Sequence, residues 1–269
     1  MQTPAVLGII AGSGLYPRLL ADSARRAGVS KIVAIAFTGE TDPALAQQVD
    51  DIHWLRVGQL GRLLECLSAA EVQHAIMAGQ IAPHNLFNLR PDLKALLLLA
   101  RLPQRNAETL FGAIADELAA VGVELLPAVT FLEEHLAPEG LIAGRKLNRR
   151  EEADIEFGLG LARQVSALDI GQTVVVRHGT VIAVEAFEGT NEAIKRGGLL
   201  ARKGAIVVKV SKPLQDMRFD VPVIGPETLR VAAAANVRVI ALEAGRTLLL
   251  EKEQLVADAR QANISIVGR

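Results

Sequence analysis

Residues 7–17 read LGIIAGSGLYP, an apolar run that passes through a glycine-containing turn into an amphipathic segment. A continuous apolar run of this length is typical of a buried strand. The segment that follows, LYPRLLADSARRAG, has the spacing of a helix that ends at Gly28. A strand, a glycine turn and a helix in this order suit a dinucleotide-binding turn, another kind of phosphate loop, or a purely structural turn.

The alternation of apolar runs and amphipathic segments continues through the first half of the chain. Further strands are predicted at residues 31–37, 51–57, 74–79 and 123–128, and helices at residues 61–70, 91–100 and 107–122. This rhythm predicts a parallel sheet with helices on both of its faces.

A polar stretch at residues 133–152, which contains proline and glycine, interrupts the rhythm. We therefore predict an N-terminal domain at residues 1–133, a linker at 134–148 and a C-terminal domain at 149–269. The second half combines a hairpin within residues 172–187 with further strands and helices. The expected class is α/β, with a parallel sheet in the first domain and a mixed sheet in the second.

The composition is that of a packed globular protein with nearly balanced charge. Hydrophobic residues make up 50%, charged residues 22%, and the formal net charge is -1. These values exclude a disordered chain and give no sign of a nucleic-acid partner. The single cysteine, Cys66, lies in an apolar helical pattern and is expected in the core. Because no positive leader precedes the first apolar run, and no run approaches the roughly 20 residues of a membrane span, we expect a cytosolic protein.

The opening turn departs from the dinucleotide fingerprint, which places three glycines at fixed spacing. Gly12 and Gly14 supply the first two, but Pro17 stands at the third position. The next strand ends in Phe37 and Thr38, where the fingerprint calls for an acid that binds the ribose. An NAD(P)-dependent oxidoreductase is therefore disfavoured.

The same turn still suits an anion. Gly12, Ser13 and Gly14 precede a helix, and the free N–H groups and the dipole of a helix start favour phosphate. A plain structural turn is an equally good interpretation of this stretch alone.

A row of charges occurs at residues 216–220, DMRFD. Read as an extended strand, it places Asp216, Arg218 and Asp220 on one face, with the two carboxylates roughly 13 Å apart. Because that distance is too long for both carboxylates to hold one metal ion unless the chain bends, a single metal-binding carboxylate is the simpler hypothesis. Lys209 and Lys212, just upstream, could meet phosphate oxygens. The pattern alone favours a solvated face with ion pairs through Arg218.

Two further stretches suggest ligand contacts. Glu185 ends an apolar run, where active-site residues of α/β proteins often lie, and Gly189, Thr190 and Asn191 then begin a helix. An ordinary capped helix start explains the latter stretch equally well. The very apolar residues 93–103 are a core helix by default, or a surface that accepts acyl chains.

Four stretches taken together resemble a known family. LGIIAGSGLYP, AGQI at residues 78–81, AVEAFEGTNEAI at 183–194 and KPLQDMRFDVPVIG at 212–225 are similar to the LpxI family, the UDP-2,3-diacylglucosamine pyrophosphatases of lipid A biosynthesis. The resemblance runs along nearly the whole chain in the family's order. It implies a Rossmann-like N-terminal domain and a catalytic α/β C-terminal domain.

The resemblance also implies an activity and a metal. Members of the family hydrolyse UDP-2,3-diacylglucosamine to lipid X (2,3-diacylglucosamine 1-phosphate) and UMP with Mg²⁺. A catalytic aspartate is expected within the stretch QDMRFDVP, with Asp220 preferred as catalytic residue and metal ligand and Asp216 as the alternative. Asn191 stands where the family tends to show aspartate, which leaves an oxygen for hydrogen bonding but no charge. The expected substrate-binding residues are Gly12, Ser13, Gly14, Gln80, Glu185, Gly189, Thr190, Asn191, Lys209, Lys212 and Arg218.

The resemblance further implies peripheral contact with lipid on the cytoplasmic face of the inner membrane. We hypothesise that part of residues 93–102, or the C-terminal helices, lines an apolar cleft for the acyl chains. No nucleic-acid partner is expected, and the oligomeric state is left open, a homodimer included. The alternative from another class is a non-catalytic nucleotide or nucleotide-sugar binding protein, which would use the same helix starts without Asp220 or a metal.

Overall fold

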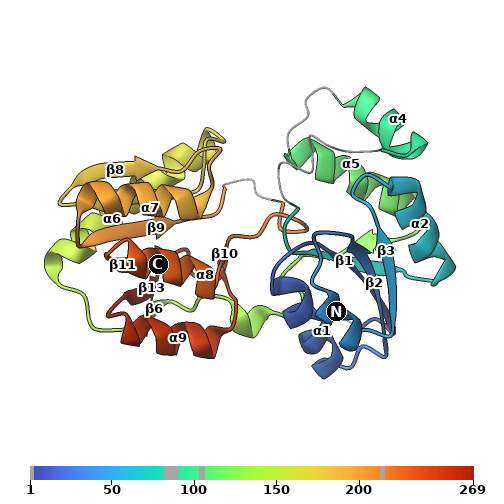
Figure 1. Ribbon diagram of the computed structural model, residues 1–269, viewed down its shortest axis with the longest axis horizontal. Helices are drawn as coiled ribbons and strands as arrows, with labels where there is room; N and C mark the ends of the chain where they lie inside the picture. The colour runs from blue at the N-terminus through green and yellow to red at the C-terminus, as the bar shows by residue number, and fades with distance from the viewer. Residues whose placement is uncertain (1–2, 82–90, 103–106, 213–215) are drawn as a thin grey trace. The chain divides into compact units, whose positions relative to one another are not determined.

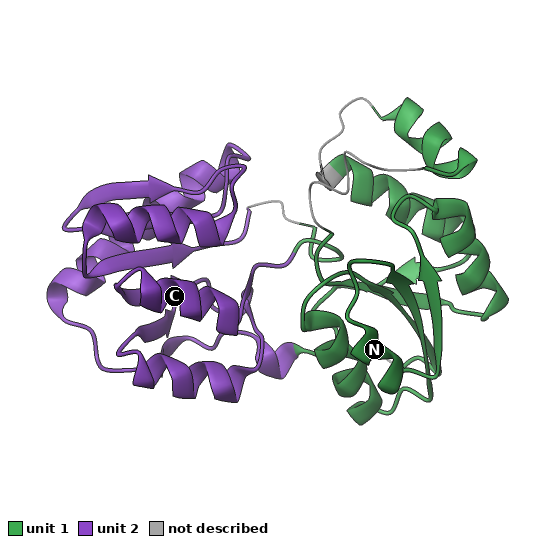
Figure 2. Ribbon diagram, in the orientation of Figure 1, with its two compact units in different colours: residues 1–132, 216–220 green, residues 133–215, 221–269 purple. Residues whose placement is uncertain are grey.

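The computed structural model describes residues 3–81, 91–102, 107–212 and 216–269. The chain folds into two compact units (Figure 2). Unit 1 comprises Met1–Leu132 and Asp216–Asp220, and unit 2 comprises Glu133–Gln215 and Val221–Arg269. The short segment Asp216–Asp220 therefore belongs by its contacts to the unit formed by the first half of the chain, although its sequence position suggests the C-terminal domain.

Unit 1 is built on a parallel sheet with the strand order β3-β2-β1-β4-β5. Its strands are β1 (Val6–Ala11), β2 (Lys31–Phe37), β3 (Asp51–Leu55), β4 (His74–Ala78) and β5 (Glu124–Leu125). Strands β1, β2 and β3 are labelled in Figure 1. The parallel sheet is confirmed, and β1 and β2 are buried along nearly their whole length, as strands covered on both faces are. The strand order reverses between β1 and β4, and open α/β sheets bind ligands at the carboxyl ends of strands at such a reversal.

Four helices and a short 3-10 helix are described in unit 1. They are α1 (Tyr16–Arg26), η1 (Pro43–Gln47), α2 (Leu60–Ala69), α4 (Leu93–Arg101) and α5 (Ala107–Ala120). α4 is capped by Asp92, whose Oδ1 accepts a hydrogen bond from Ala95 N at 2.8 Å. Asp92 Oδ2 accepts another from Gly61 N at 2.7 Å, so one side chain ties the start of α4 to the first turn of α2.

Unit 2 is built on a mixed sheet with the strand order β6-β13-β11-β9-β7-β8. Its strands are β6 (Gly140–Ala143), β7 (Thr173–Arg177), β8 (Thr180–Val184), β9 (Ala205–Lys209), β11 (Val237–Leu242) and β13 (Ser265–Gly268). β9, β11 and β13 run parallel, whereas β6 and β7 are antiparallel to their neighbours β13 and β9, and β8 is antiparallel to β7. The expected mixed sheet is therefore confirmed. A separate parallel pair joins β10 (Val223–Ile224) to β12 (Leu248–Leu249).

The helical elements described in unit 2 connect these strands. They are η2 (Glu133–His135), α6 (Arg149–Ala167), α7 (Thr190–Ala201), α8 (Pro226–Ala234) and α9 (Lys252–Gln261). α6 packs on β7 and β9, and α7 packs on β7 and β8. Among the described residues of either unit, no helix is long and apolar enough to span a membrane.

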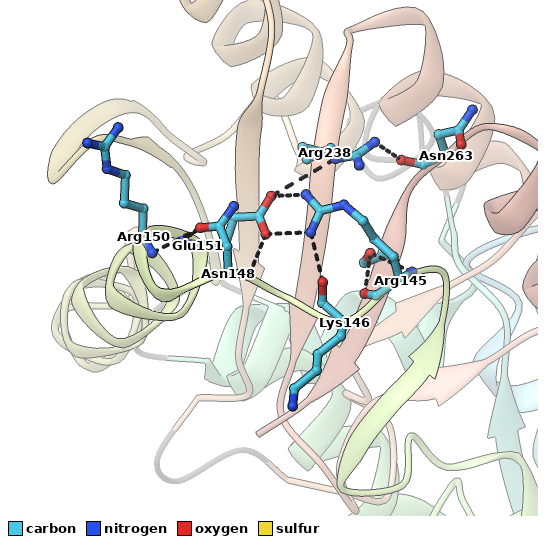
Figure 3. A network of polar contacts seen from close by, with 8 residues as sticks. Arg145, Lys146, Asn148, Arg150, Glu151, Arg238 and Asn263 are labelled. Carbon is cyan, nitrogen blue, oxygen red and sulfur yellow. Dashed lines mark hydrogen bonds and ion pairs between the residues drawn. The ribbon is translucent and has the colours of Figure 1, made fainter.

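A network of polar contacts fixes the start of α6 (Figure 3). Asn148 Oδ1 accepts hydrogen bonds from the backbone N–H groups of Arg150 and Glu151, each at 3.0 Å, and Glu151 Oε2 accepts one from Asn148 N at 2.9 Å. Arg145 forms an ion pair with Glu151 at 2.5 Å, and Arg238 approaches the same carboxylate at 4.0 Å. Burial alone would raise the pKa of Glu151, but the hydrogen bonds from Arg145 and Asn148 lower it below its ordinary value.

The hairpin between β7 and β8 turns through His178 and Gly179, as predicted. Both residues have positive φ, 50° and 69°, which a tight hairpin turn of this kind requires. Asp154 of α6 accepts hydrogen bonds from the N–H groups of both, at 2.8 Å and 2.7 Å. The turn is thus fixed by a buried carboxylate as well as by its own backbone.

Residues 134–148, expected as a linker, form part of unit 2. They contain β6, which is an edge strand paired with β13, and Ala137 N donates to Thr247 O at 2.8 Å. β6 is only four residues long, lies within a polar stretch and pairs with a strand near the far end of the chain, so local sequence gives little sign of it.

Candidate functional site

The turn after β1 lies against the turn after β4. Gly12 N donates to Ala78 O at 2.8 Å, and Ser13 N donates to Gln80 O at 2.7 Å. A Cβ on Gly12 would lie 2.5 Å from Gln80 O, and a Cβ on Gly79, whose φ is +91°, would lie 2.5 Å from Ser13 O. Both glycines are therefore required by the close approach of two backbones. The structure brings three of the predicted site residues, Gly12, Ser13 and Gln80, into direct contact.

Ser13 has both of its hydrogen-bond donors engaged within this pair of turns. Its N–H and its hydroxyl donate to Gln80 O at 2.7 Å and 2.8 Å. Gly14 follows with a φ of +86°, and α1 begins without a side-chain cap. An anion at this helix start would meet the backbone N–H groups of Gly14, Leu15 and Tyr16, because the first N–H groups of a helix lack partners within it and Pro17 has no N–H. The predicted ligand contact of Ser13 stays a prediction.

An apolar cavity of about 130 Å³ lies at the carboxyl ends of the strands of unit 1. Gly12 and Gly79 of the paired turns form part of its wall, together with Phe219. The helix α4 contributes Ala95, Leu98 and Leu99. The paired turns and the apolar chamber therefore lie together at the carboxyl ends of β1 and β4, where the strand order reverses.

Residues Asp216–Asp220 form a turn, which corrects the extended strand expected from their alternating pattern. Asp216 O accepts hydrogen bonds from Phe219 N at 3.2 Å and from Asp220 N at 3.0 Å. Asp216 Oδ1 also accepts one from Arg218 N at 3.0 Å. An aspartate that binds the backbone two residues ahead stabilises a turn at the expense of extended chain.

Two contacts anchor this turn to unit 1. Ala128 N, just beyond β5, donates to Met217 O at 2.7 Å. The ring of Phe219 lies 5.6 Å from the ring of Phe111 of α5, a favourable aromatic separation. The aromatic side chain of Phe219 therefore forms part of the wall of the apolar chamber.

The carboxylates of Asp216 and Asp220 differ in how they are engaged. Arg218 Nη2 lies 2.6 Å from Asp216 Oδ2. This hydrogen bond lowers the pKa of Asp216 and raises that of Arg218. Within the part of the chain that the structure describes, the carboxylate of Asp220 has no hydrogen bond or ion pair. Asp216 is thus committed to Arg218, whereas the oxygens of Asp220 are available to a ligand.

A second polar cluster lies in unit 2, at the ends of β8 and β9 and the start of α7. Thr190 Oγ1 donates to Glu185 Oε1 at 2.9 Å and accepts from Lys209 Nζ at 2.7 Å. Thr173 Oγ1 lies 3.3 Å from the same hydroxyl. Glu185 and Lys209 are only 6% and 4% exposed, and Glu185 Oε2 has no partner among the described residues.

The strand directions explain this cluster. β7 is antiparallel to β9, so Thr173 at the start of β7 lies opposite Lys209 at the end of β9. β8 ends at the same edge, where Glu185 N donates to Thr173 O at 2.8 Å. A buried ammonium and a buried carboxylate are tolerated here because the hydroxyl of Thr190 links them.

The remaining predicted residues of unit 2 lie at the same edge of its sheet. Gly189 precedes α7 with a φ of +83° and provides no side-chain cap. Asn191 is half-buried in the first turn of that helix. Lys212 forms an ion pair with Asp169. These positions suit the binding of a ligand at a helix start, which stays a prediction.

The predicted site residues fall into two groups. Unit 1 holds Gly12, Ser13, Gly14, Gln80, Asp216, Arg218 and Asp220, and unit 2 holds Glu185, Gly189, Thr190, Asn191, Lys209 and Lys212. Within the described residues, no cluster of three or more histidine, cysteine, aspartate or glutamate side chains could hold a metal ion alone. Mg²⁺ commonly takes one or two carboxylates plus phosphate oxygens and water. A single available carboxylate such as Asp220 therefore fits a magnesium ion shared with a phosphorylated ligand.

Sequence reasoning missed two members of these groups. Thr173 joins the cluster of unit 2, and its place at the start of a strand was visible only once the antiparallel register with β9 was known. Phe219 lines the cavity, although its apolar character between two charged residues was a usable signal.

Each of the two α/β units has polar side chains at the carboxyl ends of strands, which is where open α/β sheets generally bind their ligands. The model of the LpxI N-terminal domain matches residues 6–135, and that of the LpxI C-terminal domain matches residues 138–267. The chain belongs to the LpxI family.

Two known proteins place this membership in context. The UDP-2,3-diacylglucosamine pyrophosphatase LpxI of Caulobacter vibrioides is 31% identical over 274 aligned residues, which cover 97% of this chain and 96% of that protein. The biotin carboxylase domain of the Hydrogenobacter thermophilus 2-oxoglutarate carboxylase, a solved structure, is 12% identical. It covers 67% of this chain and 36% of that one with a TM-score of 0.28, a likeness too weak to bear on fold or function.

Proposed function

We propose that the chain is a Mg²⁺-dependent UDP-2,3-diacylglucosamine pyrophosphatase, which hydrolyses the diphosphate to lipid X and UMP. Membership of the LpxI family makes the chain a hydrolase of a diphosphate bond. The observation that carries the choice of substrate is the 31% identity to the Caulobacter protein along 97% of this chain.

Asp220 is the residue proposed to hold the metal. Its carboxylate is uncommitted, whereas that of Asp216 is paired with Arg218 at 2.6 Å. A bound Mg²⁺ supplies charge neutralisation on the diphosphate and a water of lowered pKa. Asp216 acts on the same turn as a positioning residue, because it holds the guanidinium of Arg218 and the backbone of the turn.

Lys209 is proposed to bind the diphosphate or the phosphate released from it. Its ammonium is buried at the end of β9 and is held by Thr190 at 2.7 Å. A charge held in place in a site of low dielectric stabilises developing negative charge more strongly than a mobile surface lysine does. Glu185 and Thr190 thus orient Lys209.

The apolar chamber of unit 1 is proposed to take acyl chain. Its walls are formed by aliphatic and aromatic side chains, among them Leu98 of α4 and Phe219. Burial of each methylene group contributes about 0.8 kcal/mol, so a chamber of this character selects for lipid. We further propose that the protein meets the cytoplasmic face of the inner membrane peripherally.

One assay separates this function from a non-catalytic nucleotide-sugar binding protein. The purified chain is incubated with UDP-2,3-diacylglucosamine and Mg²⁺, with and without EDTA, and the products are identified by mass. Lipid X and UMP in equal amounts, lost on chelation and restored by added Mg²⁺, are expected. Binding of the substrate without either product, at any metal concentration, would favour the binding protein.

A further inference from the structure

The solvent-facing side of α4 is apolar. Leu93, Leu96 and Leu97 are 72%, 54% and 49% exposed, and their spacing places them on one face of the helix. The opposite face buries Ala95 and Leu98, which line the chamber of unit 1. Because the inner face of α4 already packs on the core of unit 1, its outer leucines are expected to contact another apolar partner, such as a lipid or a protein surface.

Cations flank this exposed face. Lys94 and Arg101 are exposed and belong to α4, which carries no acidic residue. Lys94 also reaches Glu117 of α5 at 2.7 Å. Leucines with basic residues at their margin have the chemistry of a helix that lies in the interface of a membrane with anionic headgroups.

The size of the face argues for lipid over a second copy of the chain. Three partly exposed leucines on one short helix present on the order of 300 Å², against roughly 800 Å² per partner in a stable protein interface. A bilayer needs no shape-matched area, because it takes up apolar side chains individually.

We propose that the outer face of α4, defined by Leu93, Leu96 and Leu97, docks on a bilayer that contains anionic lipid. Lys94 and Arg101 then lie at the level of the headgroups. The proposal rests on the proposed function, because a diacylated substrate has to be taken from a membrane. Since the inner face of the same helix lines the chamber, docking brings the bilayer within one helix diameter of the proposed acyl site.

The first test measures co-sedimentation of the full chain with vesicles of phosphatidylethanolamine and phosphatidylglycerol, and with vesicles of phosphatidylcholine alone. The variant Leu93→Gln/Leu96→Gln/Leu97→Gln keeps good helix formers and leaves the chamber untouched. The matched control is Leu168→Gln/Leu199→Gln/Leu200→Gln, three leucines of unit 2 that are at least as exposed. We expect the α4 variant to lose about tenfold or more in partition to the anionic vesicles, and the control to stay within about twofold.

A second test reports on insertion directly. Trp54 is the chain's single tryptophan, so Trp54→Phe removes the native tryptophan fluorescence. Adding Leu96→Trp to this variant places the only tryptophan on the outer face of α4. A shift of its emission to shorter wavelength on addition of anionic vesicles, and quenching by brominated lipid, are expected. Unchanged emission at vesicle concentrations that sediment the protein would overturn the proposal.

Failure of this inference and failure of the proposed function give different results. Vesicle binding is measured without substrate, and turnover is measured separately on substrate in detergent micelles. Binding through α4 without turnover supports the docking face and contradicts the hydrolase. Turnover in micelles with no vesicle binding, or equal vesicle binding by the α4 variant and wild type, overturns the docking face.

The same variants also test a second copy of the chain as the partner. Self-association of the wild type that is lost in the α4 variant, with no vesicle binding, assigns the face to a second copy and overturns the proposal. Matching thermal unfolding of all variants excludes misfolding as the cause.

Discussion

Lys209 Nζ donates a hydrogen bond to Thr190 Oγ1 at 2.7 Å, and the same hydroxyl donates to Glu185 Oε1 at 2.9 Å. One hydroxyl therefore joins a buried cation to a buried anion across two strand ends and a helix start. The function of this chain of contacts, as we propose it, is to hold the lysine at a fixed place for the diphosphate.

Removal of this hydroxyl should impair catalysis. Thr190→Val keeps the shape of the side chain but removes the link to Lys209, and should lower kcat/KM for UMP release about 10- to 100-fold, the equivalent of one charge-assisted hydrogen bond. Thr190→Ser restores a hydroxyl and should stay within about threefold. Thr180→Val, on an exposed threonine at the start of β8, is the matched control. Wild-type kinetics in Thr190→Val would remove this hydroxyl from the proposed site.

The paired turns of unit 1 should not accept a methyl group at Gly79. Its Cβ would lie 2.5 Å from Ser13 O, and its φ of +91° disfavours any other residue. Gly79→Ala should therefore lower the free energy of unfolding by about 1–3 kcal/mol. Gly112→Ala, in α5 with no atom within 4 Å of its added Cβ, should raise it by about 0.5–1 kcal/mol. Denaturant titrations measure both, and equal stability of the two variants contradicts the close approach.

The ion pair at the start of α6 should make stability depend on pH. Burial raises the pKa of Glu151, but the hydrogen bonds from Arg145 and Asn148, together with the charges of Arg145 and Arg238, outweigh it and lower that pKa in the folded state. The contribution of the ionised Glu151 to the free energy of unfolding is therefore full above the unfolded-state pKa of about 4.3. This contribution is lost as the pH falls through the lowered pKa of the folded state. Glu151→Gln keeps the cap but not the ion pair, so it should cost roughly 1 kcal/mol at neutral pH and progressively less below about pH 4.

The control for this pH effect is Glu156→Gln, on an exposed glutamate of the same helix. It should leave the free energy of unfolding unchanged across the same pH range. A constant difference between wild type and Glu151→Gln from neutral to acid pH would show that the charge of Glu151 is not responsible.

Filling the chamber of unit 1 should affect lipid substrates selectively. Ala95 is buried on its wall, so Ala95→Phe should raise KM for the long-chain substrate by about tenfold while a short-chain analogue changes little. Ala100→Phe makes the same change at an exposed position of α4 and serves as the control in detergent micelles. Equal effects on long and short chains would exclude the chamber as an acyl site.

Much of the fold was predictable because local sequence and tertiary structure agree. The apolar runs that became β1, β2 and β9 are strands buried along almost their whole length, and such strands leave a continuous signal. The hairpin at His178 and Gly179 was predictable for a similar reason, because its turn chemistry is local.

Features that depend on a side chain binding the backbone, or on distant partners, were not predictable from the apolar pattern. The alternation of charged and apolar residues at 216–220 suggested a strand. The side chain of Asp216 instead accepts a hydrogen bond from the backbone N–H of Arg218, which stabilises a turn. β6 lay within a polar stretch, and only its pairing with β13 makes it a strand. Ser13 resembled a free anion ligand because its sequence context cannot show that Gln80 O accepts from both of its donors.

The most direct measurement compares wild type, Asp220→Asn and Asp216→Asn for UMP release from UDP-2,3-diacylglucosamine at saturating Mg²⁺, with substrate binding measured in parallel. Asp220→Asn should lose roughly 10³-fold in kcat, because it removes the proposed metal ligand, and should still bind substrate. Asp216→Asn frees Arg218 without removing that ligand and should lose only about tenfold. Near-normal turnover by Asp220→Asn, with Asp216→Asn inactive, would contradict the assignment of Asp220. Near-normal turnover by both variants would contradict a catalytic site on this turn.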